Sequence, residues 1–327
     1  MNSSTSRTAL ITGLRGQDGS YLAEFLLTKK YRVFGTSQVK DCFFRLPDLN
    51  QQVEILQLDL GSAADVRDVI NKVRPDEVYN LAARSSSSQF FDDPIATADI
   101  NGLAAVRLLE AILEISPRTR FCQAASSEIF AGVDISPQDE NTPFHPLNAY
   151  GAAKTYAANI VSAYRARHGL FATTAILFNH ESPRRGLDYV TRKITNTVAK
   201  IAYGQAKELM LGNLDSSRDW GFAGDYAKAM WLMQQQLDAE DFVIATGLTH
   251  TVREFCEIAF SYVGLDYRKF VRIDPQWSRR TDGVLLCGNS SKARQKLNWQ
   301  PSITFEGLVK MMVDADLIKL KLNASKS

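Results

Sequence analysis

Cysteine is scarce in this chain of 327 residues, and long apolar runs are absent. The four cysteines, Cys42, Cys122, Cys256 and Cys287, include no C-x-x-C pair, so the sequence indicates neither a zinc knuckle nor a disulfide framework. Scattered thiols are typical of a reducing compartment, and we expect a cytoplasmic protein. No run approaches the roughly 18 apolar residues of a membrane span, and the start, MNSSTSRTALITG, lacks the long apolar region of a signal peptide.

An excess of either charge is also missing. The 38 basic and 36 acidic residues are spread along the chain and leave a net charge of +2, which argues against a nucleic-acid partner. There is no internal repeat, no low-complexity segment and no residue pattern of a metal site. Because 45% of the residues are hydrophobic, the chain can bury a core large enough for one big domain or two modest ones.

Strand-like apolar runs alternate with helical stretches over residues 1–178. The runs RVFGTS, VEILQL, EVYNLAA, RFCQAA and FATTAILF are separated by SAADVRDVINKV, TADINGLAAVRLLEAILEI and AYGAAKTYAANIVSAYRARH. This alternation predicts an α/β fold with a doubly wound parallel sheet, the Rossmann arrangement. The rhythm loosens afterwards, and we expect residues 179–327 to form mostly a smaller substrate-binding domain over the carboxyl ends of the strands, with some segments returning to the first domain.

A glycine-rich loop opens the chain within ALITGLRGQDGSYLAEFLL. Gly13, Gly16 and Gly19 have the spacing G-x-x-G-x-x-G, between a strand expected over residues 9–12 and a helix expected over residues 20–30. Glycines let a backbone approach a pyrophosphate, and the N–H groups of a helix N-terminus point at the anion. We interpret the loop as a dinucleotide site, in preference to a plain strand-turn-helix.

Residues that follow the next two strands bear on the choice of dinucleotide. Asp59, after VEILQL, is placed either to accept a hydrogen bond from adenine or simply to form a turn, and its position favours neither. The second strand ends in VFGTSQVKD, with no carboxylate before Asp41 to bind a ribose 2'-hydroxyl. Ser37, Lys40 and Arg15 suit a 2'-phosphate instead, so we predict NADP.

Tyr150 and Lys154, in NAYGAAK, have the i, i+4 spacing that places both on one helix face. An ammonium beside a phenol lowers the pKa of the phenol, which suits a Tyr that exchanges a proton with a sugar hydroxyl. Spacing alone does not single out this pair, because the chain holds two others, Tyr189 with Lys193 and Tyr203 with Lys207. Order along the chain favours the first pair, since it opens the helix after the strand RFCQAA, whose end borders the expected cofactor crevice.

That strand is followed by Ser126, Ser127 and Glu128. Carbonyl reduction needs a hydride donor, a Tyr and a hydroxyl, whereas an added carboxyl group can remove a proton beside a ketone and protonate a leaving hydroxyl, which permits elimination. The alternative is that Glu128 only caps a helix, and its spacing favours neither interpretation.

These segments resemble the GDP-mannose 4,6-dehydratase family within the extended short-chain dehydrogenase/reductases. The resemblance runs from about Thr8 to Asp316, and its most specific blocks are NHESPRRG and LGNLDSSRDWG, because nothing in the fold requires them. Further matching segments are TGLRGQDGSYLAEFLL, RPDEVYNLAA, NAYGAAK, VTRKIT and ATGLTHTVREF.

The resemblance implies a lyase that converts GDP-D-mannose to GDP-4-keto-6-deoxy-D-mannose, with bound NADP reduced and reoxidised within one turnover. Tyr150 would be the base at the C4 hydroxyl, with Lys154 as its electrostatic partner and ligand of the nicotinamide ribose. Ser126, where the family usually has Thr, would hold the C4 oxygen. Glu128 would take the C5 proton and assist loss of the C6 hydroxyl as water.

Two further sets of residues match family binding positions. Those that match cofactor positions are Gly13, Gly16, Gly19, Asp59, Leu60, Leu81, Ala83, Ser85, His180 and Arg185. Those that match positions around the GDP moiety are Asn179, Val190, Lys193, Gly212, Arg218, Arg279 and Asp282. The helices expected over residues 94–115 and 148–168 resemble those that pair in this superfamily, which implies a homodimer or homotetramer.

Three alternatives stay open at this point. A GDP-4-keto-6-deoxy-sugar reductase or epimerase shares the fold, the Tyr and Lys, and the Ser-Ser-Glu strand end. A dehydratase for a related GDP-sugar would share the mechanism as well. A catalytically silent paralogue would bind nucleotide only, and the presence of Tyr150, Lys154 and Glu128 argues against it.

Overall fold

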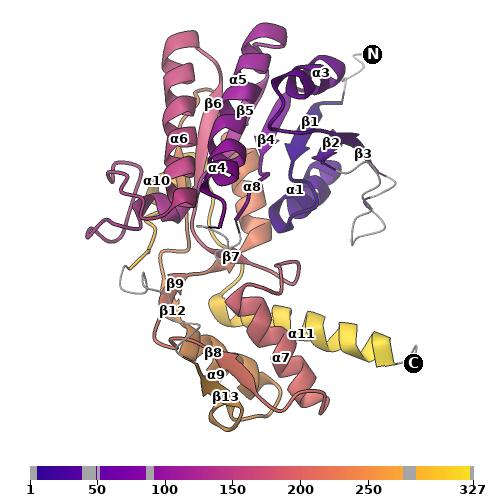
Figure 1. The fold of residues 1–327 in the computed structure, drawn as a ribbon, viewed down its shortest axis with the longest axis vertical. Helices are drawn as coiled ribbons and strands as arrows, with labels where there is room; N and C mark the ends of the chain where they lie inside the picture. Colours follow the sequence, from indigo (N-terminus) through magenta and orange to yellow (C-terminus); the bar gives the residue numbers. More distant parts are fainter. Residues whose placement is uncertain (1–5, 39–48, 50–51, 86–91, 275–284, 325–327) are drawn as a thin grey trace.

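A seven-stranded parallel sheet organises the upper part of the molecule in Figure 1, and a smaller group of helices and short strands lies below its carboxyl ends. The computed structural model describes residues 6–38, 49, 52–85, 92–274 and 285–324. Of the helices within these ranges, none combines the length and apolar character that a membrane span requires.

The strand order of the sheet is β11-β6-β5-β4-β1-β2-β3, and every neighbouring pair is parallel. Chain order reverses on the two sides of β1, which pairs with both β2 and β4, and such a reversal opens a ligand crevice at the carboxyl ends of the strands. The strands are β1 (Thr8–Thr12), β2 (Arg32–Ser37), β3 (Val53–Gln57), β4 (Glu77–Asn80), β5 (Arg120–Ala124), β6 (Ala172–Leu177) and β11 (Phe242–Ile244).

Helices cover both faces of the sheet, because successive side chains of each buried strand point to opposite sides. Leu10 packs with α3 (Ala63–Val73), α5 (Ala104–Ile115) and α6 (Ala149–His168) in one core. Its neighbour Ile11 packs on the other face with α1 (Gln17–Thr28), α8 (Ala223–Met233) and α10 (Ser291–Leu297). The predicted doubly wound α/β fold is therefore confirmed.

Two expected elements differ from the structure in detail. The helix expected over residues 20–30 begins earlier, at Gln17, with Gly16 as its N-cap, and ends at Thr28. The segment TADINGLAAVRLLEAILEI is not one regular helix, because α4 (Pro94–Ala98) and α5 are joined by a π-helical stretch, η2 (Asp99–Leu103).

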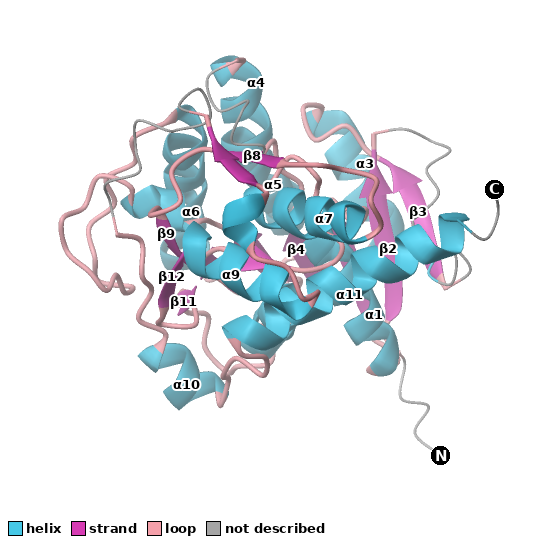
Figure 2. Cartoon of the chain, turned by 90° about the horizontal axis from the view of Figure 1, so that it is seen from below, coloured by secondary structure: helices cyan, strands magenta, loops and turns pink. Residues whose placement is uncertain are grey.

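The lower part has a hydrophobic core of its own, formed by side chains of α7, α9, α11 and the strand β8. Figure 2 views these elements from below, with α7, α9 and α11 in front of the sheet. Arg192 and Asp316 form a buried ion pair between α7 and α11. The elements are β7 (His180–Glu181), α7 (Val190–Ala202), β8 (Leu209–Leu211), β9 (Ser217–Asp219), β10 (Gly221–Phe222), β12 (Thr249–Thr251), α9 (Val252–Tyr262), η4 (Tyr267–Lys269), β13 (Val271–Ile273) and α11 (Phe305–Ala324).

The chain crosses between the two parts more than once. Helices α8 and α10 and strand β11 belong to the second half of the sequence but pack in or on the sheet. The fully buried Asp219 connects β9 to two later segments of the chain. Its carboxylate accepts hydrogen bonds from the N–H groups of Thr246, Gly247 and Gly288. A division after residue 178 thus stays a prediction, with these segments as its exceptions.

A chain of buried polar side chains links the carboxyl ends of three strands. The Thr12 hydroxyl of β1 donates to Asn80 Oδ1 of β4 at 2.7 Å, and Asn80 Nδ2 donates to Gln123 Oε1 of β5 at 2.8 Å. The Thr12 hydroxyl also accepts the N–H groups of Leu81 and Ala82. This polar chain sets how the loops after β1, β4 and β5 leave the sheet.

We expect Gly13→Ala to lower the melting temperature far more than Gly169→Ala. Both glycines have a left-handed φ, +68° and +66°, which costs an alanine about 1–2 kcal/mol. A Cβ on Gly13 would also lie 2.7 Å from the backbone of Ala82, whereas one on Gly169 meets nothing within 4 Å; the clash adds about 1–3 kcal/mol. Thermal melts of the two variants measure this difference. Equal shifts in melting temperature would show that the backbone at Ala82 moves away from the new Cβ at no cost in stability.

Candidate active site

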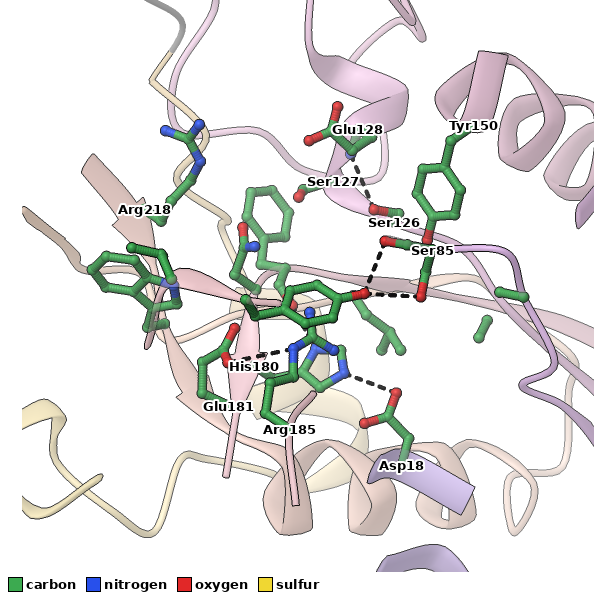
Figure 3. Close-up of a pocket in the computed structure, with 18 of the residues that line it drawn as sticks. Asp18, Ser85, Ser126, Ser127, Glu128, Tyr150, His180, Glu181, Arg185 and Arg218 are labelled. Atoms are coloured by element: carbon green, nitrogen blue, oxygen red, sulfur yellow. Dashed lines mark hydrogen bonds and ion pairs between the residues drawn. The ribbon is translucent and has the colours of Figure 1, made fainter. Parts of the chain in front are cut away.

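A cavity lies at the carboxyl ends of the strands, between the sheet and the lower part. Its walls come from the loops that follow β4, β5 and β6, from the first turns of α1 and α6, and from residues around β8 and β9 (Figure 3). Such a position suits a ligand that spans a topological switch point.

Most of the predicted site residues line this one cavity. They are Leu81, Ala83, Ser85, Ser126, Glu128, Tyr150, Lys154, Asn179, His180, Arg185, Val190, Gly212 and Arg218. The glycine loop itself, with Gly13, Arg15, Gly16 and Gly19, is not among the lining residues, and neither are Ser37, Asp59, Leu60 and Lys193. Lys40, Arg279 and Asp282 lie outside the described residues.

Tyr150 and Lys154 lie in the first turns of α6 and are both buried. The Lys154 ammonium donates to the carbonyl of Ala124, the last residue of β5, at 2.8 Å and lies 5.8 Å from the centre of the Tyr150 ring. The Tyr150 phenol is hydrogen bonded to the side chain of Ser126. The strand end and the helix therefore present a hydroxyl, a phenol and an amine to one space.

The expected electrostatic effect of Lys154 on Tyr150 is wrong for this structure. Burial raises the pKa of Tyr150, and the hydrogen bond to Ser126 offsets only part of this rise. Burial also lowers the pKa of Lys154 to about 8, although the negative charge of Asp18 opposes the change. The physical reason is desolvation, which disfavours the charged forms of both residues. The cation that favours the Tyr150 phenolate in this structure is Arg185.

Glu128 lies in η3 (Ser127–Phe130), the short turn that follows β5. Its Oε2 accepts a hydrogen bond of 2.7 Å from the side-chain amide of Asn148, and its N–H donates to Ser126 Oγ. In Figure 3 its side chain extends to the opposite side of its backbone from the hydroxyls of Ser126 and Tyr150. The N-cap of η3 is Ser126, and Glu128 lies in the first turn of that helix, so the cap of η3 does not use the Glu128 side chain.

Asp18 faces His180 across the floor of the cavity (Figure 3). His180 Nε2 lies 3.0 Å from Asp18 Oδ2, and Nδ1 lies 2.7 Å from the carbonyl oxygen of Phe178. Because both partners only accept, both ring nitrogens must carry protons, and the imidazole is positively charged.

The two pKa values agree with this assignment. Burial lowers the pKa of His180, but the charge and hydrogen bond of Asp18 outweigh it, so the net shift is upward from 6.5. Burial raises the pKa of Asp18, but the charge and hydrogen bond of His180 outweigh it and bring the pKa to about 2.

Arg185 supplies a second cation at the cavity wall. Its guanidinium lies 3.6 Å from the centre of the Tyr189 ring, and the Tyr189 hydroxyl donates to the carbonyl of Ser85 at 2.9 Å. The buried Nε of Arg185 lies 3.4 Å from Glu181 Oε2, and it makes no hydrogen bond within the part of the chain that the structure describes. An unsatisfied buried N–H on a cation indicates a place for an anionic or polar ligand group.

The glycine loop fits a dinucleotide phosphate. A Cβ on Gly19 would lie 2.6 Å from the carbonyl oxygen of Gly13 and from Leu14 Cα, so the turn closes only with glycine there. Gly16 is the N-cap of α1 and supplies no side-chain hydrogen bond to the helix. The first turn of α1 therefore presents its N–H groups without a side-chain cap, as a phosphate site requires.

Asp59 and Ser37 lie further along the expected cofactor groove. Asp59 is exposed, and its Oδ1 accepts a hydrogen bond of 2.9 Å from the N–H of Gly61. This contact is the one expected of an Asp that forms a turn. Ser37 ends β2. Their contacts with adenine and with a 2'-phosphate stay predictions.

Several lining residues escaped the sequence reasoning, among them Asp18, Glu181 and Tyr189. Asp18 and Glu181 stand inside the blocks GQDGS and NHESPRRG, so membership in a specific block was the available signal. Tyr189 was noticed only through its spacing to Lys193. Within the described residues, no group of three or more His, Cys, Asp or Glu side chains is arranged to hold a metal ion.

Comparison with known proteins gives a consistent result. Residues 10–312 match the family model described as GDP-mannose 4,6 dehydratase. The chain is 46% identical over 325 residues to GDP-mannose 4,6 dehydratase 1 of Arabidopsis thaliana, covering 95% of this chain and 90% of that protein. It is 45% identical over 344 residues to the GDP-mannose 4,6 dehydratase of Homo sapiens, covering 96% and 92%.

Solved structures share the fold at lower identity. UDP-glucose 4-epimerase of Thermotoga maritima, with UDP-glucose, aligns with a TM-score of 0.84 at 23% identity, covering 96% of this chain and 99% of that one. RMD of Pseudomonas aeruginosa, complexed with NADPH, aligns with a TM-score of 0.80 at 21% identity, covering 96% and 98%.

Asp18→Asn should destabilise the protein in a pH-dependent manner. His180 has a raised pKa in the folded state, so the pair contributes fully below pH 6.5, and its contribution is lost as pH rises through the folded pKa of His180. On the acid side, the contribution of Asp18 is present above its ordinary pKa of 3.8 and is lost as pH falls towards about 2. We expect a loss of about 2–4 °C in melting temperature near pH 5.5 and a smaller loss near pH 9.

Thermal melts at the two pH values measure the effect, with His180→Gln as the control background. There, Asp18→Asn should lose its pH dependence. If the dependence is the same in both backgrounds, the ion pair is not its source.

Proposed function

Because the chain belongs to the GDP-mannose 4,6-dehydratase family, we propose that it is an NADP-dependent hydro-lyase that converts GDP-D-mannose to GDP-4-keto-6-deoxy-D-mannose and water. The observation that carries the proposal is the family match over residues 10–312. It is supported by the arrangement of Ser126, Glu128, Tyr150 and Lys154 around one cavity.

The cofactor supplies the redox chemistry. When bound, NADP would supply a hydride acceptor for C4 of the sugar and, once reduced, a hydride donor for C6. The glycine loop would hold its pyrophosphate at the N-terminus of α1, and Lys154, His180 and Arg185 line the cavity next to this helix. Arg15, Ser37 and Lys40 remain our candidates for the 2'-phosphate.

Tyr150 would take the proton of the C4 hydroxyl. Burial opposes the loss of the phenol's own proton, so the residue depends on neighbours that stabilise the phenolate. Ser126 is such a neighbour through its hydrogen bond, and the positive charge of Arg185 is another. Lys154, one turn further along α6, would add a second positive charge in its ammonium form. Ser126 would then hold the C4 oxygen as the ketone forms.

Glu128 would carry out the elimination. A C4 ketone acidifies the C5 proton, which the carboxylate removes. The same proton then passes to the C6 hydroxyl, the C6–O bond breaks, and water leaves. Glu128 ends this step ionised, as it began, and the step leaves a 4-keto-5,6-ene and one water. Hydride addition at C6 and protonation at C5 then complete the keto-deoxy sugar, and this proton balances the one that Tyr150 removed from the C4 hydroxyl.

The GDP moiety would extend towards the lower part of the molecule. Asn179, Val190, Gly212 and Arg218 line that end of the cavity. The planar guanidinium of Arg218 suits a diphosphate. Lys193 lies outside the cavity lining, but it belongs to α7, the helix that begins at Val190. Burial lowers the pKa of Lys193.

We further propose that the chain assembles as a homodimer or homotetramer through α4, η2 and α6, and that it is cytoplasmic, as its scattered thiols suggest. Helix α6 contacts α4 and η2. Large apolar side chains on these neighbouring elements are exposed, namely Ile95 at 82%, Leu103 at 43% and Tyr156 at 42%. Exposed apolar residues on adjacent helices are typical of a surface that a second copy covers.

Purified protein should have at least a dimeric mass by light scattering at micromolar concentration. Leu103→Arg should shift the mass towards the monomer, because a charge in an apolar interface is costly to desolvate. Leu237→Arg is the matched control, since Leu237 is 94% exposed and lies outside these helices. A wild-type monomer, or equal effects of the two substitutions, would contradict the proposed interface.

The function itself is tested by incubating the purified protein with GDP-mannose and analysing the product by mass spectrometry and NMR. A dehydratase forms a 4-keto-6-deoxy product without added NADPH, whereas a reductase consumes NADPH stoichiometrically. Glu128→Gln should permit oxidation at C4 but slow formation of the deoxy product by about a hundredfold to ten-thousandfold. Absorbance near the reduced nicotinamide band should therefore rise and persist.

Tyr150→Phe is the control for that variant, because it removes the base for the first step and should give neither the absorbance rise nor the product. A Glu128→Gln variant that forms product at nearly the wild-type rate would remove the case for elimination through this residue.

A further inference from the structure

Asn148 connects two parts of the site through the two ends of one side-chain amide. Its Oδ1 accepts a hydrogen bond of 2.7 Å from the N–H of Gly151 and so caps α6, the helix that carries Tyr150 and Lys154. Its Nδ2 donates at 2.7 Å to Oε2 of Glu128. A residue that only caps a helix needs the first contact and not the second.

The orientation of this amide is determined by its partners. If the amide were turned over, its oxygen would face the Glu128 carboxylate and its NH₂ group would face the N–H of Gly151, so both contacts would become repulsive. Both hydrogen bonds therefore depend on each other, and asparagine satisfies them together.

The start of α6 also lies directly against the turn that carries Glu128. A Cβ on Gly151 would be 2.6 Å from the backbone carbonyl oxygen of Glu128, so only glycine permits this approach. The close contact leaves Asn148 within reach of the carboxylate and makes the position of Glu128 depend on the position of α6.

We propose that Asn148 is a positioning residue that holds the Glu128 carboxylate apart from the hydroxyls of Ser126 and Tyr150. Glu128 must act at C5 and C6 while those two hydroxyls act at C4, so the groups need separate places. Ser126 Oγ lies 3.3 Å from the backbone nitrogen of Glu128, from which it accepts a hydrogen bond. Its own hydroxyl proton is therefore a nearby donor that competes for the carboxylate once the amide is removed. If Glu128 bound the Ser126 hydroxyl, its carboxylate would no longer reach C5. The Ser126 hydroxyl would then also be unable to hold the C4 oxygen.

This inference rests on the proposed role of Glu128, and three substitutions test it. Asn148→Ser and Asn148→Asp both keep an N-cap acceptor but lack the amide donor, and the aspartate adds a negative charge beside Glu128. Asn148→Ala loses the cap as well. A residue that acts only as a cap should tolerate Ser and Asp about equally well, because Asn, Asp and Ser are similar N-caps.

We expect the rate of keto-deoxy product formation to fall about tenfold in Asn148→Ser and further in Asn148→Asp. The tenfold loss is smaller than the loss expected for Glu128→Gln, because the acid-base residue is still present. Melting temperatures of both should stay near that of the wild type, and only Asn148→Ala should melt lower. In single-turnover reactions with GDP-mannose, the reduced-nicotinamide absorbance should persist longer in the Ser and Asp variants. Exchange of deuterium from D₂O into C5 should slow in parallel.

The Glu128→Gln background separates this inference from the proposed function. There, Asn148→Asp should add nothing, because the positioned carboxylate is already gone. A further loss in that background, or wild-type turnover of Asn148→Asp in the otherwise unchanged protein, overturns the positioning role while the role of Glu128 stands.

Crystal structures of Asn148→Ser and Asn148→Asp provide a readout that does not depend on any substrate. We expect the Glu128 side chain to turn towards Ser126 in both. A Glu128 that keeps its wild-type orientation in both variants overturns the inference, even if GDP-mannose proves not to be the substrate.

Discussion

The buried polar chain from Thr12 through Asn80 to Gln123 is the constraint on which the site depends. These side chains have no water to bond to, so each must find its partner on the adjacent strand, and this sets the register of β1, β4 and β5 at their carboxyl ends. Gly13 follows Thr12 directly, and Leu81 and Ala82 donate their N–H groups to the Thr12 hydroxyl. The glycine loop and the loop that lines the cavity therefore leave the sheet from one hydrogen-bonded point.

The reacting groups are also buried polar side chains that need hydrogen-bond partners. Lys154 reaches the sheet by donating to the carbonyl of Ala124, next in the chain to Gln123. Burial lowers its pKa to about 8 and raises that of Tyr150, so each of these buried residues becomes charged only at a cost in free energy. Because burial strengthens the hydrogen bonds that remain, proton transfer at Tyr150 depends on a few fixed contacts.

The lower part completes the site because the chain returns repeatedly to the sheet. Asp219 gathers three N–H groups from two separate segments, and His180 joins the lower part to α1 through Asp18. A nucleotide sugar that reaches from Ser126 and Tyr150 to Arg218 would contact both parts. Three carboxylates hold the two parts of the site in place, because each of them pairs with a cation or accepts from backbone N–H groups. They are those of Asp18, Glu181 and Asp219.

The sequence by itself determined the fold class, the positions of most strands and the glycine loop, because periodicity and local motifs report local structure. It also placed Ser126, Glu128, Tyr150 and Lys154 near one strand end, whereas their roles were implied by the resemblance to a family. Blocks such as NHESPRRG also pointed to the family. Tertiary structure alone decided that β11 joins the sheet, that burial raises the pKa of Tyr150, and that Asp18 favours the charged form of His180. It also decided that Asn148 links Glu128 to α6. These properties arise from desolvation and from contacts between residues as far as 162 positions apart, such as Asp18 and His180, and no local pattern in a chain encodes either of them.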